Sequence, residues 1–326
     1  MDKLSRKILD ELQRNGFRKN IELANLFGVG ERTIRRHINI MKGKGLLKIV
    51  ASPNPVVFGC NGWAKIGIKV EPGYLFEITN ALLEESRVPL VALSKGEFDI
   101  FISVIFETVE ELSDFINLRL ASKKGVKSTE TMLYVNPLKF LSVYFTGNFP
   151  RKSEKYSDIA HDRRKIDEID RKIVAILGAD ALSPIKNISA ALGVGQRTIS
   201  NRMKKLYDNE FIINNISIAP ELMEYESWAV IGLNINQAFS WHDLETLIHH
   251  PAIYHASATI GRFNIILVVR FHNLNMLNEF VQVELAKLKG VSKIEEFLHS
   301  KPLKFHNVIW AHVPLIEAGQ DALHVD

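Results

Sequence analysis

The stretch GVGERTI, from Gly28 to Ile34, occurs again as GVGQRTI from Gly193 to Ile199, 165 positions later and with one residue changed. The surrounding sequence repeats at the same spacing without gaps, so that NPLKF (136–140) matches KPLKF (301–305). A register held from about residue 2 to residue 140, mostly at apolar and glycine positions, is typical of an internal repeat. The chain is therefore a tandem duplication of one unit.

The first fifty residues have the apolar spacing of three short helices. The third carries Ile34, Ile38 and Met41 at i, i+4 and i+7, which places these side chains on one face. Only GVG separates the second helix from the third, and glycine permits such a tight turn. This pattern predicts a helix-turn-helix. The segment GLLKIVASPNPVVFG (45–59) is then predicted to form a small strand and a wing that ends in a turn.

Positive charge gathers in this helical segment. Residues 1–50 carry twelve Lys and Arg against five acidic residues, a balance of +7, whereas residues 62–145 carry nine basic and eleven acidic residues, a balance of −2. Clustered cations are expected where a protein meets a polyanion. The pattern favours nucleic-acid binding over a merely solvated charged surface.

The outer face of the third helix is the predicted DNA-reading surface. Its apolar face is retained in the second copy as Ile199, Met203 and Leu206, while the outer residues change. Arg prefers guanine and Asn prefers adenine, each good pair contributing roughly 1–3 kcal/mol of discrimination. The alternative is that these side chains contact only phosphate or water. The predicted DNA-binding residues are Arg32, Thr33, Arg35, Arg36 and Asn39, with Arg197, Thr198, Ser200, Asn201 and Lys204 in the second copy.

From Trp63 onward the apolar period alternates between that of strands and that of helices. Strands are predicted at 63–70, 88–94, 99–106 and 126–135, and helices at 74–86 and 109–120. This order is βαββαβ, the ferredoxin-like arrangement, and the second copy repeats it from Trp228 to Leu298. The predicted fold class is α+β. We find no nucleophile beside a base, phosphate loop or paired carboxylates in this region, so the chain is not expected to be an enzyme.

Five segments follow from these patterns. Residues 146–164 are polar and nearly free of aliphatic side chains, which predicts a linker. Winged helix-turn-helix units are predicted at 1–60 and 165–225, and ferredoxin-like effector and dimerisation domains at 61–145 and 226–326, the last with a C-terminal tail.

Composition excludes several classes of protein. Of the 326 residues, 46% are hydrophobic and 24% charged. Apolar runs such as IFISVIF (100–106) are much shorter than the ~20 residues that span a bilayer, and the charged start MDKLSRK (1–7) is not a signal peptide. Cys60 is the only cysteine, which excludes an internal disulfide and a thiolate metal site. We expect a cytoplasmic protein without membrane contact, bound metal or cofactor.

Taken together, these motifs resemble the Lrp/AsnC (leucine-responsive, feast/famine) regulators. The resemblance is carried by TIRRHINIMKGKGLLK (33–48), SKGEFDIFISVIF (94–106) and KGVKSTETMLYV (124–135), and it covers nearly the whole chain twice. It implies transcription regulators whose βαββαβ domains pair through their sheets and bind a small molecule, often an amino acid, between associated dimers. A typical member has one copy, so this chain resembles a covalent dimer with two heads for two half-sites about one DNA turn apart. Further homo-oligomerisation through the ferredoxin-like domains is also implied.

The resemblance also implies an effector site, at a G-x-aromatic-Asp turn and a Thr-x-Thr in the last strand. The first copy keeps both motifs, whereas the second has Asn at the Asp position and Ile294 and Glu296 at the threonine positions. The first copy is therefore the better candidate, although glycine and Asp or Asn in such a turn are equally compatible with a structural role. Gly30 and Gly195 replace the serine that usually begins the recognition helix, which predicts weaker capping. The predicted effector-binding residues are Gly96, Asp99, Thr129, Thr131, Gly261 and Asn264.

An enzyme is the alternative interpretation. Siroheme decarboxylases resemble this family in fold and often carry two related halves, and nine of the eleven histidines lie between His242 and His324. Three of them fall in HHPAIYHAS (249–257). That enzyme family has further His, Tyr and Arg residues around the following strand turn, where this chain reads SATIGRFN (257–264) with the regulator-like Gly261. Surface or core packing is the commoner reason for a histidine, and metal or tetrapyrrole binding is the other.

Overall fold

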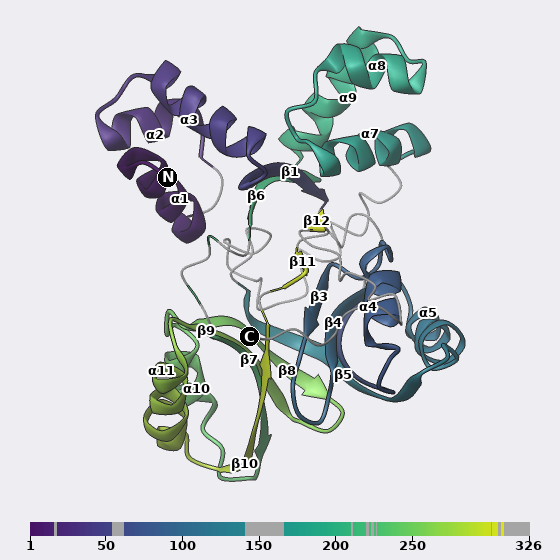
Figure 1. The fold of residues 1–326 in the computed structure, drawn as a ribbon, viewed down its shortest axis with the longest axis vertical. Coiled ribbons are helices and arrows are strands. Elements are labelled where there is room, and N and C mark those ends of the chain that lie inside the picture. Colours follow the sequence, from purple (N-terminus) through teal and green to yellow (C-terminus); the bar gives the residue numbers. More distant parts are fainter. Residues whose placement is uncertain are drawn as a thin grey trace, which may run out of the picture.

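In the computed structural model of the chain, two helical heads lie at one end and a β-sheet body lies at the other (Figure 1). The structure describes residues 1–15, 18–53, 62–140, 166–209, 211–219, 222, 225, 227–300, 302–305 and 308–309. The predicted linker 146–164 and Cys60 lie outside these residues.

Each head contains the three predicted helices and the strand after them. The first consists of α1 (Lys3–Asn15), α2 (Asn20–Phe27), α3 (Glu31–Gly43) and β1 (Leu47–Pro53). The second consists of α7 (Glu168–Ala179), α8 (Ile185–Leu192), α9 (Gln196–Asp208) and β6 (Ile212–Ile218). Gly28 and Gly193 end α2 and α8 at φ values of 66° and 65°, a left-handed conformation that favours glycine, so the repeated GVG is a turn requirement.

The two heads are joined through β1 and β6. These strands pair with each other in antiparallel fashion, from Leu47 opposite Ile218 to Pro53 opposite Ile212. The strand predicted after the third helix is confirmed, and its partner is its own counterpart in the second head; residues 54–59 of the predicted wing lie outside the described residues. One apolar core includes buried residues of both heads, such as Ile34, Ile49, Ile173 and Ile199, so the heads form one packed unit.

The body contains both predicted βαββαβ units. The first half has β2 (Gly62–Val70), α4 (Leu75–Leu83), β3 (Leu90–Leu93), β4 (Ile100–Phe106), α5 (Val109–Asp114) with its π-helical continuation Phe115–Leu120, and β5 (Val126–Phe140). The second half has β7 (Ser227–Ile235), α10 (Trp241–Leu247), β8 (Ile253–Ile260), β9 (Ile265–Phe271), α11 (Leu274–Glu279) with the continuations Phe280–Glu284 and Leu285–Lys287, β10 (Val291–His299), β11 (Lys304–Phe305) and β12 (Val308–Ile309).

The strands of both halves form one sheet, in the order β10-β7-β9-β8-β5-β2-β4-β3-β11-β12. β5 continues five residues beyond its predicted end at 135, because its last residues pair with β8 as far as Phe140 opposite His255. The equivalent pairing at the other edge joins β11 to β3, with Phe305 opposite Leu90. Because β10 pairs with β7 and the following β11 pairs with β3, the sheet closes on itself around a pseudo-twofold axis.

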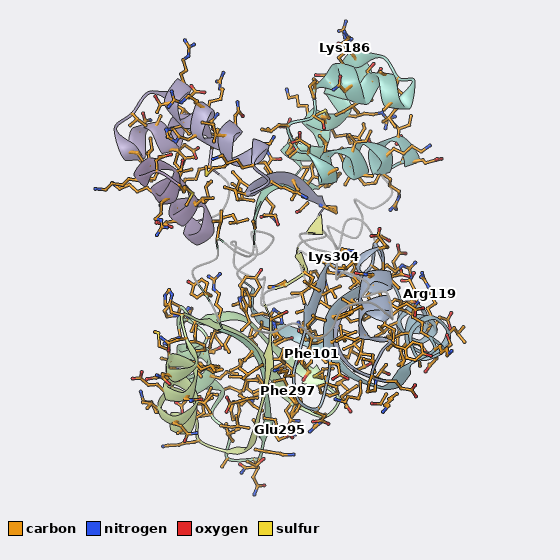
Figure 2. All side chains as sticks on the ribbon, in the orientation of Figure 1. Phe101, Arg119, Lys186, Glu295, Phe297 and Lys304 are labelled. Atoms are coloured by element: carbon orange, nitrogen blue, oxygen red, sulfur yellow. The ribbon has the colours of Figure 1, made fainter. Side chains whose placement is uncertain are left out.

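Two kinds of core stabilise the body. On the outer faces, the helices of each half cover their own strands, as Ile78 and Leu82 of α4 do over Ile66 and Ile102. Between the two inner faces lies an aromatic core that both halves supply. Phe101 and Phe297, whose ring centroids are 5.7 Å apart, lie where the two halves meet (Figure 2).

The shared core of the heads predicts that they unfold together. Ile49→Ala should lower the free energy of unfolding by about 2–5 kcal/mol, because Ile49 is 4% exposed and its truncation leaves a cavity. Amide hydrogen exchange should accelerate in α7 and α9 as well as in α3. Ile40→Ala, at a 45% exposed position of α3, is the control and should change stability by no more than about 0.5 kcal/mol. Faster exchange confined to the first head would contradict this coupling.

Candidate nucleic-acid interface and effector site

The outer face of α3 presents the predicted DNA-binding residues to solvent. Ile34, Ile38 and Met41 are buried on the opposite face, which fixes the rotation of the helix. Arg35 makes an exposed ion pair with Glu31, at 2.9 Å, and this weak surface contact leaves the guanidinium accessible. Gly30 precedes the helix without a side-chain cap, as predicted. The residues Arg32, Thr33, Arg35, Arg36 and Asn39 are all exposed.

The outer face of α9 is arranged in the same way. Arg197, Thr198, Asn201 and Lys204 are exposed, and Ser200 is half-buried. Gly195 likewise begins the helix without a side-chain cap. The structure therefore brings each predicted set together on one helix face, and the two faces differ in charge and hydrogen-bonding groups.

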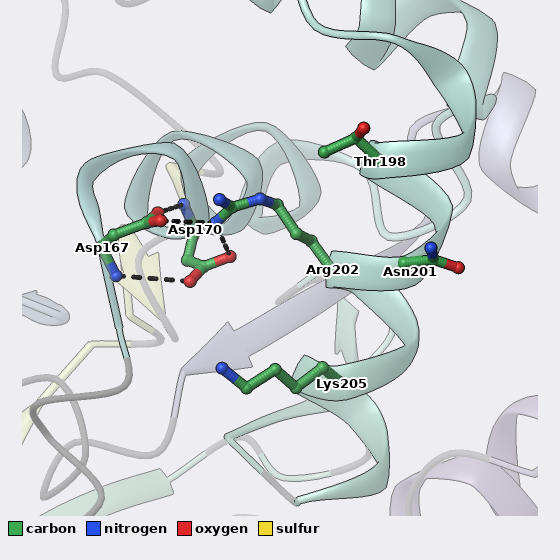
Figure 3. Close-up of a pocket in the computed structure, with 6 residues that line it drawn as sticks. All are labelled: Asp167, Asp170, Thr198, Asn201, Arg202 and Lys205. Carbon is green, nitrogen blue, oxygen red and sulfur yellow. Dashed lines mark hydrogen bonds and ion pairs between the residues drawn. The ribbon is translucent and has the colours of Figure 1, made fainter.

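An ion-pair network missed from the sequence holds α9 against α7. Arg202 contacts Asp167 at 2.6 Å and Asp170 at 2.9 Å, beside a hollow of about 350 Å³ that Thr198, Asn201 and Lys205 also line (Figure 3). The hydrogen bond from the Asp170 amide, followed by that from Arg202, lowers the pKa of Asp167. The sequence carried no signal for this network, because Asp167 and Asp170 lie 35 and 32 residues before Arg202 and form no recognised motif with it. Arg202 thus joins α9 to the start of α7 and holds the exposed face of α9 in place.

The first head has a different polar contact at the equivalent place. His37, the counterpart of Arg202, lies 2.9 Å from the Ser5 hydroxyl and 3.5 Å from Asp2. Hydrogen bonds from the backbone and side chain of Ser5 lower the pKa of Asp2 to about 2. A contact between heads adds to this, since Lys42 of α3 lies 3.2 Å from Asp180 after α7. Both α3 and α9 are therefore held by contacts within their heads, and Lys42 adds a contact between the heads.

Two predicted effector residues are engaged in structural hydrogen bonds. The Asp99 carboxylate accepts from the Val70 amide at 2.9 Å and pairs with Lys69 at 3.0 Å. At the equivalent position, Asn264 Oδ1 accepts from the Ile235 amide at 3.0 Å. These bonds join the turn to the neighbouring strand in both halves, which supports the structural interpretation of Asp99 and Asn264.

The other four predicted effector residues lie on the turns and on β5. Gly96 adopts a φ of 113°, and the Lys69 ammonium donates to its carbonyl at 2.9 Å. Gly261, at a φ of 139°, lies against β5 so closely that a Cβ there would stand 2.6 Å from the Thr131 carbonyl oxygen. Thr129 and Thr131 lie on β5, opposite Ile68 and Ile66 of β2. The structure thus brings Gly261 of one half to Thr131 of the other.

Arg262 connects the two turns, although no motif in the sequence marks it. It pairs with Glu97 of the first half and Glu295 of its own half, and its guanidinium lies 5.8 Å from the Phe297 ring centroid. These contacts raise the pKa of Arg262, the hydrogen bond to Glu97 most strongly. The sequence offered one signal for this contact: the equivalent positions 97 and 262 carry opposite charges.

A second group of polar residues lies inside the closed sheet. Lys65, 1% exposed, has its ammonium 3.4 Å from the Ser103 hydroxyl, and burial lowers its pKa to about 7. His255 stacks on Tyr134 with ring centroids 4.7 Å apart, and burial together with the nearby Lys65 lowers the pKa of this histidine to about 3. The same two causes lower the pKa of His299 to about 3.

The histidines considered as ligands do not converge. His249 is exposed and His255 lies in the interior. The Nδ1 atom of His250 accepts a hydrogen bond from the Ala252 amide at 3.1 Å. Within the described part of the chain, no three His, Cys, Asp or Glu side chains are placed to hold a metal ion. No helix in that part is long and apolar enough to cross a membrane.

Family models match both heads and the first half of the body. The AsnC-type helix-turn-helix domain matches residues 166–207, the Lrp/AsnC ligand binding domain matches 64–142, and a winged helix-turn-helix DNA-binding model matches 1–48. An uncharacterized HTH-type transcriptional regulator of Pyrococcus furiosus is 33% identical over 141 residues, which are 43% of this chain and 95% of the relative. The HTH-type transcriptional regulator FL11 of Pyrococcus abyssi is 30% identical over 130 residues, 40% of this chain and 85% of that protein.

Among solved structures, the siroheme decarboxylase NirDL in complex with an iron-uroporphyrin III analogue is similar in fold over nearly the whole chain. The TM-score is 0.59, with 14% sequence identity and 92% of both chains covered. The family models and the sequence relatives thus indicate the same family as the two helix-turn-helix heads and the duplicated body. The chain belongs to the Lrp/AsnC family and carries two helix-turn-helix domains.

Proposed function

We propose that the chain is a sequence-specific DNA-binding transcriptional regulator and not an enzyme. Its two unlike heads read one operator, and its body binds a small metabolite such as an amino acid. The observation that carries this proposal is the pair of exposed polar and cationic faces on α3 and α9, held in one unit by the β1–β6 pairing. Such faces match the geometry by which a recognition helix enters the major groove.

The effector part of the proposal is supported by the match of residues 64–142 to a ligand binding domain. The contact between Gly261 and Thr131 places residues of both halves at one edge of β5. A ligand at this edge would touch both halves and could therefore change how they pack. Assembly into larger oligomers through the body stays a prediction from the family resemblance.

A tetrapyrrole enzyme is the alternative function, favoured by the likeness in fold to NirDL over nearly the whole chain. Against it, the three histidines of HHPAIYHAS lie in different environments: His249 is exposed, His250 accepts a backbone hydrogen bond and His255 is buried. The imidazoles of His255 and His299 are 3% and 7% exposed, so neither faces solvent where a tetrapyrrole could reach it. A tetrapyrrole titration of the purified chain therefore tests the enzyme alternative, just as the DNA-binding measurement tests the regulator.

DNA binding should depend steeply on salt. Lys and Arg on both heads release condensed counterions, so with 6–10 phosphate contacts the affinity should fall by roughly 10³–10⁵ between 50 and 200 mM salt. Electrophoretic mobility shifts with upstream DNA from the source genome measure this, and siroheme added to the same preparation should give no Soret shift. Salt-independent affinity together with a saturable Soret shift would favour the enzyme.

Substitutions at Asp99 should separate a structural role from effector binding. Asp99→Ala removes the acceptor of the Val70 amide and should cost about 1–3 kcal/mol of stability. Asp99→Asn should retain the fold, because Asn264 makes the same bond in the second half. If the turn binds an effector, Asp99→Asn and Thr129→Ala should blunt the response of DNA affinity to a panel of amino acids while DNA binding without effector persists. A normal response in both variants would remove these residues from the effector site.

The operator should be an imperfect palindrome. Arg35 and Arg36 on one head correspond to Ser200 and Asn201 on the other, so the half-sites should diverge where these side chains reach. Replacing both Ser200 and Asn201 by Arg should shift selection toward a symmetric site, by tenfold to about a hundredfold at roughly 1–3 kcal/mol per altered contact. Selection of random duplexes by wild type and double variant tests this. Recovery of one symmetric sequence by both proteins would show that these positions do not read bases or that equivalent heads of two chains form the binding unit.

A further inference from the structure

Backbone pairing alone does not distinguish the two halves of the body. β5 pairs with β8, and the equivalent β11 pairs with β3, in registers that match at the offset of 165 residues. A first half could therefore form the same strand pairs with the first half of another copy. Apart from the covalent linkage between the halves, any preference of a first half for a second half must come from side chains that differ between the two.

The interior of the closed sheet contains one such difference. Lys65 and Ser103 come from the first half, and their counterparts in the second half are Val230 and Val268. The two imidazoles near Lys65 both come from the second half, where His255 and His299 stand at the positions of Leu90 and Tyr134. The polar groups are thus distributed between the halves so that only a first half and a second half bring the amine and the imidazoles together.

Pairing of like halves would separate these groups. Between two first halves, Lys65 would face Leu90 and Tyr134, and two lysines would share one interior. Between two second halves, His255 and His299 would face Val230 without the amine. Buried polar groups that lose their polar surroundings are costly, and their best-attested use is to specify which surfaces pair.

The edge of the body contains a second difference, of charge. Glu97 and Arg262 occupy equivalent positions and contact each other, so they meet at the pseudo-twofold axis. Residues at such an axis meet themselves when identical units pair. Two first halves would bring Glu97 to Glu97, and two second halves would bring Arg262 to Arg262, so like charges would oppose either pairing.

We propose that the Glu97–Arg262 ion pair and the interior group of Lys65, His255 and His299 select pairing between unlike halves. The first half accepts the second half of its own chain or of another copy, and it rejects another first half. This pairing rule holds whether or not the heads read DNA.

Single cysteines in full-length chains can report which halves pair. In the structure Leu133 is opposite Ile260, and the first-half counterpart of Ile260 is Lys95. All chains carry Cys60→Ser. A chain with Leu133→Cys is unfolded and refolded at about 1 mM, near the effective concentration of linked modules, with a chain carrying either Ile260→Cys or Lys95→Cys. A disulfide to 260 reports exchange between unlike halves, and a disulfide to 95 reports pairing of two first halves.

The disulfide between positions 133 and 260 should exceed that between 133 and 95 by about tenfold or more. Glu97→Arg in both chains should reduce this ratio several-fold, because like charges then meet in every arrangement, and adding Arg262→Glu should restore most of it. Lys65→Met should lower the ratio while leaving the midpoint of urea unfolding unchanged or higher, since apolar groups often replace buried charge without loss of stability. Equal yields of the two disulfides from the unsubstituted background would overturn the proposal.

A second measurement decides the matter if exchanged dimers do not accumulate. In a urea-unfolding cycle on the full chain, the double variant Glu97→Arg/Arg262→Glu should unfold at a higher midpoint than Arg262→Glu alone. Recovery should be partial, because Arg262→Glu also replaces the ion pair of Arg262 with Glu295 by two like charges, although Glu295 still pairs with Lys293. A double variant no more stable than either single one would show that positions 97 and 262 are not coupled, and would overturn the charge part of the proposal.

Discussion

The structure depends on strand pairing between the two copies of the repeat. β1 finds its partner in β6, β5 in β8, and β3 in β11, and each of these pairs joins one copy to the other. An unpaired edge strand exposes backbone donors and acceptors that invite association with other chains. The duplication satisfies these edges within one chain, and it does so at the heads and at the body independently.

This pairing explains the arrangement of the candidate site. The β1–β6 pair brings Lys42 to Asp180 and puts both heads over one core, so α3 and α9 cannot move apart without breaking that core. Closure of the body brings the turn with Gly261 onto β5 at Thr131 and the turn with Glu97 to Arg262. A ligand that alters the fit of these two turns would therefore act on contacts between the two halves.

The sequence predicted the local structure well because local structure depends on local pattern. The spacing of Ile34, Ile38 and Met41 determined the buried face of α3 and hence the exposed face, and the left-handed turns at Gly28 and Gly193 required glycine. It did not predict partners far apart in the chain. The extension of β5 to Phe140, the Arg202 contacts with two acidic residues and the buried Lys65 all depend on which surfaces meet, and no periodicity records this. The role of Asp99 could not be decided from the sequence either, because the same motif is compatible with a turn and with a ligand site.

We propose that one chain, with two unlike heads, occupies one operator. Hydroxyl-radical footprinting of the purified chain on a duplex selected from the source genome, with the stoichiometry measured by native mass spectrometry, tests it most directly. We expect one chain per duplex and two protected segments whose centres lie about 10–10.5 base pairs apart, the spacing of adjacent major grooves. A single protected segment, or two chains on one duplex with each supplying the same head, would contradict it.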